Sequence, residues 1–297
     1  PVSVPSVFSP LIAGTMNWGC WGSKLSTAEL LGRIDLCVEL GITTFDHADI
    51  YGHYTTEAEL GQALHHRSHL RTKMQHITKC GIRLVTPNRP DYQIRSYDTS
   101  AQHILASAER SLINLKTDYL DVLLIHRPDP LMDPDEIAEA FTQLKAAGKV
   151  LHFGVSNFTP SQCSLLHHYF PLLTNQVEVS ILHLDPFLDG SLDHCRLLQL
   201  IPTAWGPLGS GKLFSPEHRN DRTERILAVA NLLGERYQLS SDQILLSWLH
   251  THPGGIIPVL GTANPDRLQQ AWSSRDTRLT REEWYMLWRA STGKEVP

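Results

Sequence analysis

The sequence predicts an α/β protein, specifically a closed (β/α)8 TIM barrel with extra helices between strands 7 and 8 and at the C-terminus. Short apolar runs alternate with amphipathic helical patterns along the 297 residues. Strands that read as nearly continuous apolar runs are typical of a parallel sheet covered by helices, and eight such units indicate a closed barrel. An open doubly wound sheet is the alternative, but it expects G-x-G-x-x-G after an early strand, and the chain has none.

The eight expected strands cover residues 11–15, 43–46, 76–79, 119–126, 150–155, 172–177, 202–205 and 255–259. Helices are expected over residues 27–40, 56–65, 100–115, 134–147, 160–168, 192–200, 224–237, 241–250, 265–272 and 281–290. Gly41 and Gly148 end two of these helices, as C-terminal glycines do. The segment between Lys79 and Ser100 is expected to be a long solvated loop. Because no linker or composition shift divides the chain, residues 1–297 are expected to form a single domain.

Composition excludes several classes of protein. The chain has 26 basic and 31 acidic side chains and a net charge of −5, which argues against a nucleic-acid partner. No run of apolar residues is long enough to span a membrane, and residues 1–9 lack the features of a secretion signal. We therefore expect a cytoplasmic protein with no membrane partner, a monomer or a weak oligomer.

Cysteine and histidine usage predicts no metal site. The five cysteines are scattered without C-x-x-C spacing, as expected for reduced thiols rather than disulfides or a zinc site. Two histidine pairs, His65-His66 and His167-His168, stand among 16 histidines. Neighbouring positions on a helix point in different directions, and no H-E-x-x-H occurs, so these are expected to be ordinary surface or groove histidines.

Polar residues end three consecutive strands of the predicted barrel. Asp46 ends the second strand, Lys79 the third and His126 the fourth, and Tyr51 follows Asp46 by five residues. Active sites of such barrels lie at the carboxyl ends of the strands. Each residue alone has a structural explanation, such as a loop cap, a solvated lysine or a core histidine. Their occurrence on adjacent strands indicates a shared site.

These four residues suit proton donation to an oxygen atom. A free tyrosine has a pKa near 10, and a nearby ammonium stabilises the phenolate and lowers that pKa. We expect Asp46 to hold Lys79 charged, Lys79 to tune Tyr51, and His126 to orient the substrate oxygen. Protonating an oxygen is one half of carbonyl reduction, for which another group must supply hydride.

Several motifs in order resemble those of the aldo-keto reductase family. They are D-x-A-x-x-Y-G, the strand-end lysine, D-Y-L-D-V-L-L-I-H and G-K-V-L-H-F-G-V-S-N-F, and the resemblance runs from F-S-P-L-I-A-G-T-M to R-L-Q-Q. It implies an NADPH-dependent enzyme that reduces a small-molecule aldehyde or ketone, with Tyr51, Lys79, Asp46 and His126 as its catalytic tetrad and Tyr51 as general acid. An alternative within the family is a cofactor-sensing interaction module resembling potassium-channel β-subunits.

The same resemblance implies which residues bind NADPH (or NADP+). Ser156, Asn157 and Gln176 would hold the carboxamide, and Trp205 would stack on the nicotinamide ring. Ser156 and Asn157 could equally be a helix N-cap, and Trp205 a core residue. The remaining expected cofactor residues are Gly14, Thr15, Met16, Asp46, Gly206, Leu208, Gly209, Ser210, Lys212, Gly261, Arg267 and Gln270.

Two segments are expected to meet the cofactor's phosphates. Residues 206–212 match most of the P-loop pattern G-x-x-x-x-G-K-[ST], but Leu213 lacks the required hydroxyl and Pro216 interrupts the helix that should follow. Backbone contacts along the pyrophosphate are the preferred interpretation. Arg267, at a helix start, suits a ribose 2′-phosphate. Gly261, Ala263 and Ala271 depart from the family's usual residues here.

The substrate side is less defined. Trp18 and Trp21 follow the first strand and are expected either to wall an apolar pocket near Tyr51 or to be packing residues. Tyr51 and His126 are expected to contact the substrate. In the aldo-keto reductase family, which the chain resembles, the C-terminal segment often closes over the substrate. Only Ser291 to Pro297 follow the last expected helix here, so the resemblance implies a relatively open pocket. Arg83, Arg89 and Arg95 in the 80–100 loop would touch a partner or substrate, or simply be solvated.

Overall fold

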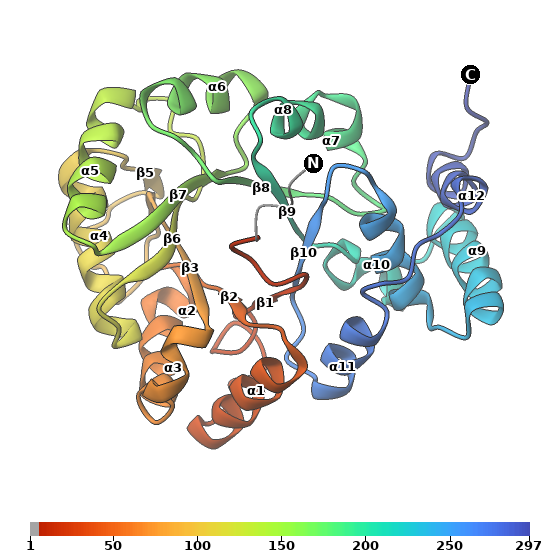
Figure 1. The fold of residues 1–297 in the computed structure, drawn as a ribbon, viewed down its shortest axis with the longest axis horizontal. Helices are drawn as coiled ribbons and strands as arrows, with labels where there is room; N and C mark the ends of the chain where they lie inside the picture. Colours follow the sequence, from red (N-terminus) through yellow and green to blue (C-terminus); the bar gives the residue numbers. More distant parts are fainter. Residues whose placement is uncertain (1–5) are drawn as a thin grey trace.

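Short apolar segments form the barrel strands where the sequence predicts them. The computed structural model describes residues 6–297, and its strands are β1 (Ile12–Gly14), β2 (Thr44–Asp46), β3 (Gln75–Cys80), β6 (Leu120–Ile125), β7 (Val150–Ser156), β8 (Thr174–Glu178), β9 (Ile201–Trp205) and β10 (Ile257–Leu260). They pair in parallel in the closed order β1-β10-β9-β8-β7-β6-β3-β2 (Figure 1). The predicted (β/α)8 barrel is confirmed.

Alternation along the strands separates two apolar layers. Ile12, Ile77, Val122 and Val259 cluster inside the barrel. Residues of the other parity, such as Phe45, face the layer between sheet and helices. Asp46 and Lys79 stand two positions after Thr44 and Ile77, so both continue the inward parity at the carboxyl ends of their strands.

The principal helices of the ring follow the strands in alternation, close to the predicted bounds (Figure 1). In α1, Ser26 and Glu29 form a capping box at the start, and Gly41, with φ of 106°, ends the helix. The longer ring helices are α1 (Thr27–Leu40), α3 (Thr56–His65), α4 (Ala101–Leu115), α5 (Pro134–Ala146), α6 (Pro160–Tyr169), α8 (Ser191–Leu197), α10 (Ser241–Thr251) and α11 (Pro265–Ser273).

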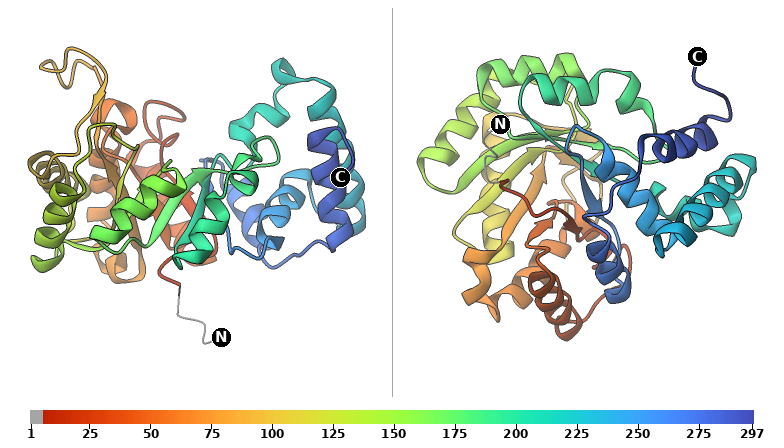
Figure 2. Two further views of the ribbon diagram at one scale, coloured as in Figure 1. Left: turned by 90° about the horizontal axis from the view of Figure 1, so that it is seen from above. Right: turned by 45° about the vertical axis from the view of Figure 1, so that its right-hand side comes forward.

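The predicted extra helices are α9 (Asp221–Tyr237), which with α10 separates β9 from β10, and α12 (Arg281–Thr292). Helices α9 and α12 lie side by side outside the ring (Figures 1 and 2). Trp248 of α10 and Trp284 of α12 stack at 4.8 Å, and each indole N–H donates to the other's backbone carbonyl. This aromatic stack attaches the outer helix pair, α9 and α12, to the barrel.

Several local features differ from the prediction. The 80–99 segment contains an antiparallel hairpin, β4 (Ile82–Arg83) and β5 (Ser96–Tyr97), rather than a loop alone. Its connection projects beyond the rest of the barrel (gold, top left in the left view of Figure 2). Strands this short carry almost no periodicity, so the pattern could not reveal them. The other unpredicted elements are α2 (Tyr51–Tyr54), α7 (Asp185–Leu188), and the 3-10 helices η1 (Ser68–Lys73), η2 (Gly209–Phe214) and η3 (Pro216–His218).

The first five residues, part of the segment 1–9 in which no secretion signal is expected, lie outside the described residues. From residue 6 onward, no helix is both long enough and apolar enough to cross a bilayer.

Candidate active site

Two charged residues meet at the carboxyl ends of adjacent strands. Asp46 ends β2 and is paired with Ile77 of β3. Lys79 lies two residues beyond Ile77, near the end of β3. The Lys79 ammonium lies 2.6 Å from Asp46 Oδ2, and both side chains are almost completely buried. Since a buried charge is costly unless it is paired and hydrogen-bonded, this pair satisfies the requirement locally.

The lysine uses all of its donors. An ammonium has three N–H groups, and those of Lys79 reach Asp46 Oδ2 at 2.6 Å, the His47 carbonyl at 2.9 Å and Tyr51 Oη at 3.1 Å. Tyr51 Oη is therefore the acceptor in its bond with Lys79. Its own hydroxyl proton stays free to be donated to another oxygen.

A left-handed turn holds Tyr51 in place. The three residues after it all have positive φ, with values of 61° at Gly52, 56° at His53 and 70° at Tyr54. A Cβ on Gly52 would lie 2.4 Å from Thr56 Oγ1, so only glycine fits there. Non-glycine residues in this region cost free energy and are concentrated at functional sites. The turn was not predicted, although Y-G-H-Y contains its glycine.

The pKa of Tyr51 is shifted in the direction opposite to the expected one. Burial raises the pKa of Tyr51, and the Lys79 ammonium opposes this rise without reversing it. The expected lowering is therefore wrong in net direction, because the phenol is desolvated more strongly than one ammonium, already shared with Asp46, can compensate. The pKa of Lys79 is raised: burial opposes the charge, but Asp46 and Tyr51 together favour it. In the protein without ligand, the site holds a neutral phenol beside a charged lysine.

His126 joins the site from the end of β6. Its ring lies 6.2 Å from the Tyr51 ring in an edge-on arrangement, and its backbone N–H donates to the Cys80 carbonyl. Desolvation, followed by the charges of Lys79, Arg127 and Arg95, holds the pKa of His126 well below its usual range. Its Nδ1 is buried without a hydrogen-bond partner among the described residues. The imidazole is neutral, so it can donate or accept one hydrogen bond at the substrate oxygen. The structure thus brings together all four predicted catalytic residues.

A buried imidazole pair behind the site was missed by the sequence reasoning. Thr15 Oγ1 donates to the Asp46 carbonyl and lies 3.0 Å from His47 Nδ1, while His47 Nε2 lies 3.0 Å from His76 Nδ1. Burial lowers the pKa of His47 to about 3 and that of His76 well below its usual range. The sequence signal that could have revealed this pair is His76, because it occupies a strand position that faces the helices, where apolar residues are expected.

The residues expected to hold a carboxamide are already connected to one another. Trp205 Nε1 donates to Asn157 Oδ1 at 2.9 Å, and Asn157 Nδ2 donates to Ser156 Oγ at 3.0 Å. Ser156 Oγ donates to the Gln176 carbonyl, and Gln176 Nε2 crosses the barrel to Asp46 Oδ1 at 2.9 Å. No other described residue donates to Gln176 Oε1, which remains available to a ligand N–H.

The expected pyrophosphate loop is a tight turn rather than a P-loop. Gly206, Gly209, Ser210 and Gly211 all have positive φ, and η2 ends at Phe214, before Pro216. A 3-10 helix, rather than an α-helix, contains Gly211 and Lys212, so the phosphate-binding context of a P-loop is missing. Lys212 is exposed, and a Cβ on Gly211 would meet open space, so the backbone here is accessible. Leu208, between the strand and the turn, is half-buried.

The segment expected at the 2′-phosphate begins α11. The Asn264 side chain already accepts from the N–H groups of Asp266 and Arg267. A phosphate there would depend on the exposed Arg267 side chain more than on the helix end. Gly261 and Gln270 are exposed, and the Gly261 carbonyl accepts from Asn17.

Two expected ligand contacts are corrected. Thr15 is completely buried and its hydroxyl bonds the Asp46 carbonyl, so of Gly14, Thr15 and Met16 only Met16 is exposed to a cofactor. Trp18 is also completely buried, edge-on to Phe45, and its indole donates to the Thr262 carbonyl. Its outward direction makes it a core residue rather than a pocket wall.

Trp21, the other tryptophan considered for the substrate side, is half-buried and lies 6.1 Å from the Tyr51 ring.

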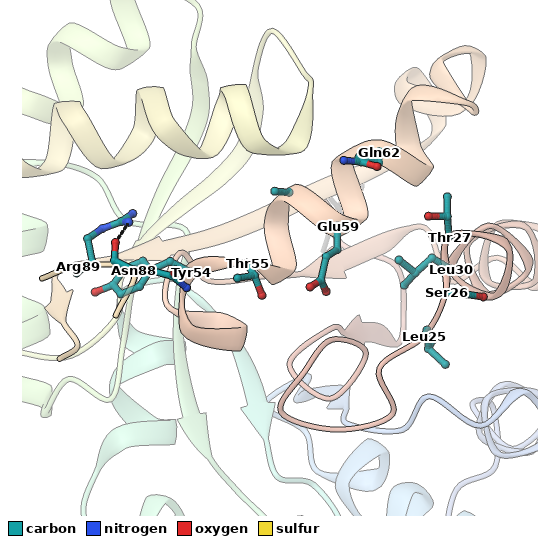
Figure 3. A pocket seen from close by; sticks show the side chains of 11 residues that line it. Leu25, Ser26, Thr27, Leu30, Tyr54, Thr55, Glu59, Gln62, Asn88 and Arg89 are labelled. Atoms are coloured by element: carbon teal, nitrogen blue, oxygen red, sulfur yellow. Dashed lines mark hydrogen bonds between the residues drawn. The ribbon is translucent and has the colours of Figure 1, made fainter. Parts of the chain in front are cut away.

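A groove of about 630 Å³ lies beside the site rather than in it (Figure 3). It runs from the start of α1 along α3 to Tyr54 and Arg89, whose guanidinium stacks on the Tyr54 ring at 4.2 Å. None of the four catalytic residues lines it. Among residues 6–297, no group of three or more His, Cys, Asp or Glu side chains could hold a metal ion.

Comparison with known proteins agrees with this geometry. A family model described as "Aldo/keto reductase family" matches residues 10–291. This chain belongs to that family.

Several similar proteins are named as oxidoreductases or reductases. A relative from Bacillus subtilis, "Uncharacterized oxidoreductase YcsN", is 46% identical over 98% of this chain and 96% of its own length. A "6-dehydroglucose reductase" from Agrobacterium fabrum is 40% identical over 94% of each chain. The crystal structure of a thermostable aldo-keto reductase, Tm1743, with the inhibitor epalrestat superposes with a TM-score of 0.76 at 25% identity, covering 95% of this chain and 94% of that one. As a member of the aldo/keto reductase family, this chain is a carbonyl-reducing enzyme.

Proposed function

We propose that the enzyme reduces aldehydes or ketones to alcohols with NADPH, and that Tyr51 donates the proton to the carbonyl oxygen. The observation that carries this proposal is the full use of the Lys79 donors, which leaves the Tyr51 hydroxyl proton free. Because burial raises the pKa of Tyr51, the phenol stays protonated at neutral pH. Lys79 stabilises the phenolate that forms when the proton leaves.

His126 supports the same step. A neutral imidazole at the end of β6, edge-on to Tyr51, can hydrogen-bond the carbonyl oxygen and orient it toward the phenol. Asp46 holds Lys79 in place and charged.

The residues of the opposite half of the rim fit a dinucleotide. Asn157, Gln176 and Trp205 offer amide groups and a flat indole for a nicotinamide carboxamide and ring. The exposed cations Lys212 and Arg267 suit phosphates, and Arg267 is the reason for proposing NADPH over NADH. A bound nicotinamide supplies hydride to the carbonyl carbon. All five cysteines are free thiols, which suits the proposed cytoplasmic location.

Replacing Tyr51 by Phe tests the mechanism. We expect kcat/KM for aldehyde reduction, followed by loss of NADPH absorbance, to fall by about 10²–10⁴, the usual contribution of a general acid. The NADPH Kd, measured by fluorescence titration, should change little. Tyr285→Phe, at an exposed ring of α12, is the matched control. Undiminished turnover by Tyr51→Phe contradicts the mechanism.

The substrate panel should contain aldehydes, ketones and quinones, and 6-dehydroglucose because a relative is named for it. NADPH binding without turnover across that panel favours the cofactor-sensing alternative instead.

A further inference from the structure

Two arginines at the rim of the site have no assigned role. Arg127 directly follows His126 after β6, and Arg95 directly precedes β5 in the hairpin that follows β3. In the ring order, β3 lies opposite β9 and β6 lies opposite β10, the strands that lead to Lys212 and Arg267. The two arginines therefore stand on the far side of the barrel from the proposed phosphate contacts, at the side of Tyr51 and His126.

The hairpin that leads from Arg95 packs against Tyr51 through β4. Ile82 of β4 is paired with Tyr97 of β5, and Ile82 and Leu84 pack in the cluster that contains Tyr51. Paired residues of an antiparallel hairpin share a face, and every second residue returns to it. Arg95 lies two positions before Tyr97, immediately outside the paired residues of β5, and its side chain is exposed.

Two carboxylates of the same loops, Asp98 and Asp129, have partners other than the two arginines. Asp98 accepts from the Ser100 side chain at 2.7 Å. Asp129 accepts from Thr99 Oγ1 at 2.9 Å and from a backbone N–H. Neither carboxylate is paired with an arginine, and within residues 6–297 Arg95 and Arg127 make no ion pair or side-chain hydrogen bond.

Other arginines of the loop are held differently. The Arg83 guanidinium stacks on the Tyr92 ring and the Arg89 guanidinium on the Tyr54 ring, each at 4.2 Å. Besides desolvation, the groups that lower the pKa of His126 are Lys79, Arg127 and Arg95, all of them cations. Asp46 is paired with Lys79, and neither arginine has a carboxylate partner within residues 6–297, so both guanidiniums are available to an anionic ligand.

We propose that Arg95 and Arg127 bind an oxyanion carried by the substrate, so that the enzyme prefers aldehydes or ketones bearing a carboxylate or a phosphate. A guanidinium fork matches either oxyanion in a bidentate geometry. Uncompensated positive charge at a rim also speeds the arrival of an anionic ligand. This substrate class rests on the proposed reductase function.

The experiment compares charged and neutral members of matched substrate pairs. One pair is succinic semialdehyde with butanal, and the other is glyceraldehyde 3-phosphate with glyceraldehyde. We expect Arg95→Gln and Arg127→Gln each to lower the charged-to-neutral ratio of kcat/KM by about tenfold or more, the size of one charge-assisted hydrogen bond. Comparing ratios cancels the intrinsic reactivity of each aldehyde. The loss should reside in KM, because the interaction is made equally in ground and transition states.

Two further variants sharpen the result. Arg281→Gln removes one charge at an exposed position of α12, remote from the site in sequence and fold, and should leave the ratio unchanged. Arg127→Lys keeps the charge but not the fork, so the ratio should fall less than with Arg127→Gln. The pair that responds more strongly identifies the oxyanion as carboxylate or phosphate.

Binding of succinate or inorganic phosphate to the protein without cofactor is measured in parallel by calorimetry. Weaker binding by both glutamine variants, but not by Arg281→Gln, supports the oxyanion site even if no aldehyde is reduced, in which case the proposed function alone fails. Unchanged ratios together with unchanged anion binding overturn the oxyanion site while leaving the reductase function standing. An equal loss for charged and neutral substrates, without a change in anion binding, also overturns it.

Discussion

The two halves of the barrel rim treat charge in opposite ways. On the β2–β3 side, Lys79 is 1% exposed and its three N–H groups all have partners within the protein. On the β9–β10 side, Lys212 and Arg267 are exposed, and neither forms an ion pair within residues 6–297. The Asp46–Lys79 pair is complete without a ligand, which suits the support of a fixed proton donor. The second half has charges whose partners a ligand would supply.

Replacing Lys79 by Met gives the largest expected effect. It leaves Asp46 buried without its cation, and removing one member of a buried ion pair typically costs about 3–5 kcal/mol in the free energy of unfolding. Loss of the phenolate's partner should also lower kcat by at least about a hundredfold. Urea unfolding and turnover measure the two effects. A fully stable Lys79→Met variant would show that the catalytic half does not depend on internal charge pairing.

The same substitution at Lys212 should behave differently. An exposed lysine without a partner contributes little to folding, so Lys212→Met should unfold at the same urea concentration as the parent. Its NADPH Kd should rise by about tenfold, as expected for the loss of one charged phosphate contact. Titration of NADPH fluorescence tests this prediction. A variant that loses stability but keeps its NADPH affinity would remove the contrast between the two halves.

The buried imidazoles behind the catalytic half predict a smaller, pH-dependent effect. The pKa of His47 is lowered from 6.5 to about 3, so the native protein resists a proton that the unfolded chain accepts below about pH 6.5. Stability is therefore complete above pH 6.5 and is lost as the pH falls toward 3. Each such histidine contributes a slope of at most about 1.4 kcal/mol per pH unit.

His47→Gln should reduce the slope of the free energy of unfolding against pH by the contribution of one titrating histidine. The parent and the variant are compared by urea unfolding at pH 8, where the difference reflects packing alone, and again at pH 5.5. A free-energy difference between them that is the same at both pH values would show that His47 is not the group that titrates.

The sequence predicts the barrel well because each strand is a short apolar run and most helices carry their own caps. The four candidate catalytic residues lie together, as predicted, for a related reason: strand ends of a parallel barrel converge whatever their loops do. Asp46, Lys79 and His126 needed only correct strand assignment, and Tyr51 needed its position in the turn five residues after Asp46.

The predictions that were wrong concern the direction in which a side chain points and the extent to which it is buried from solvent. Trp18 and Thr15 follow a strand whose length decides which way they point, and a shift of one residue reverses that direction. The pKa of Tyr51 balances burial against one ammonium, and burial is a property of the folded structure. The Gln176–Asp46 bond joins residues 130 positions apart, a pairing that no local pattern contains.

Because of the left-handed turn after Tyr51, the conformational entropy needed to position this side chain is lost when the chain folds, not when the substrate reacts. Gly52, His53 and Tyr54 confine the backbone to a narrow region that most residues avoid, and the loss of entropy is incurred once, when the chain folds. A phenol on a freely rotating loop would incur that loss in every catalytic cycle. In the proposed mechanism, the turn thus preorganises the Tyr51 hydroxyl for contact with the carbonyl oxygen, and folding has already supplied the free energy for that order.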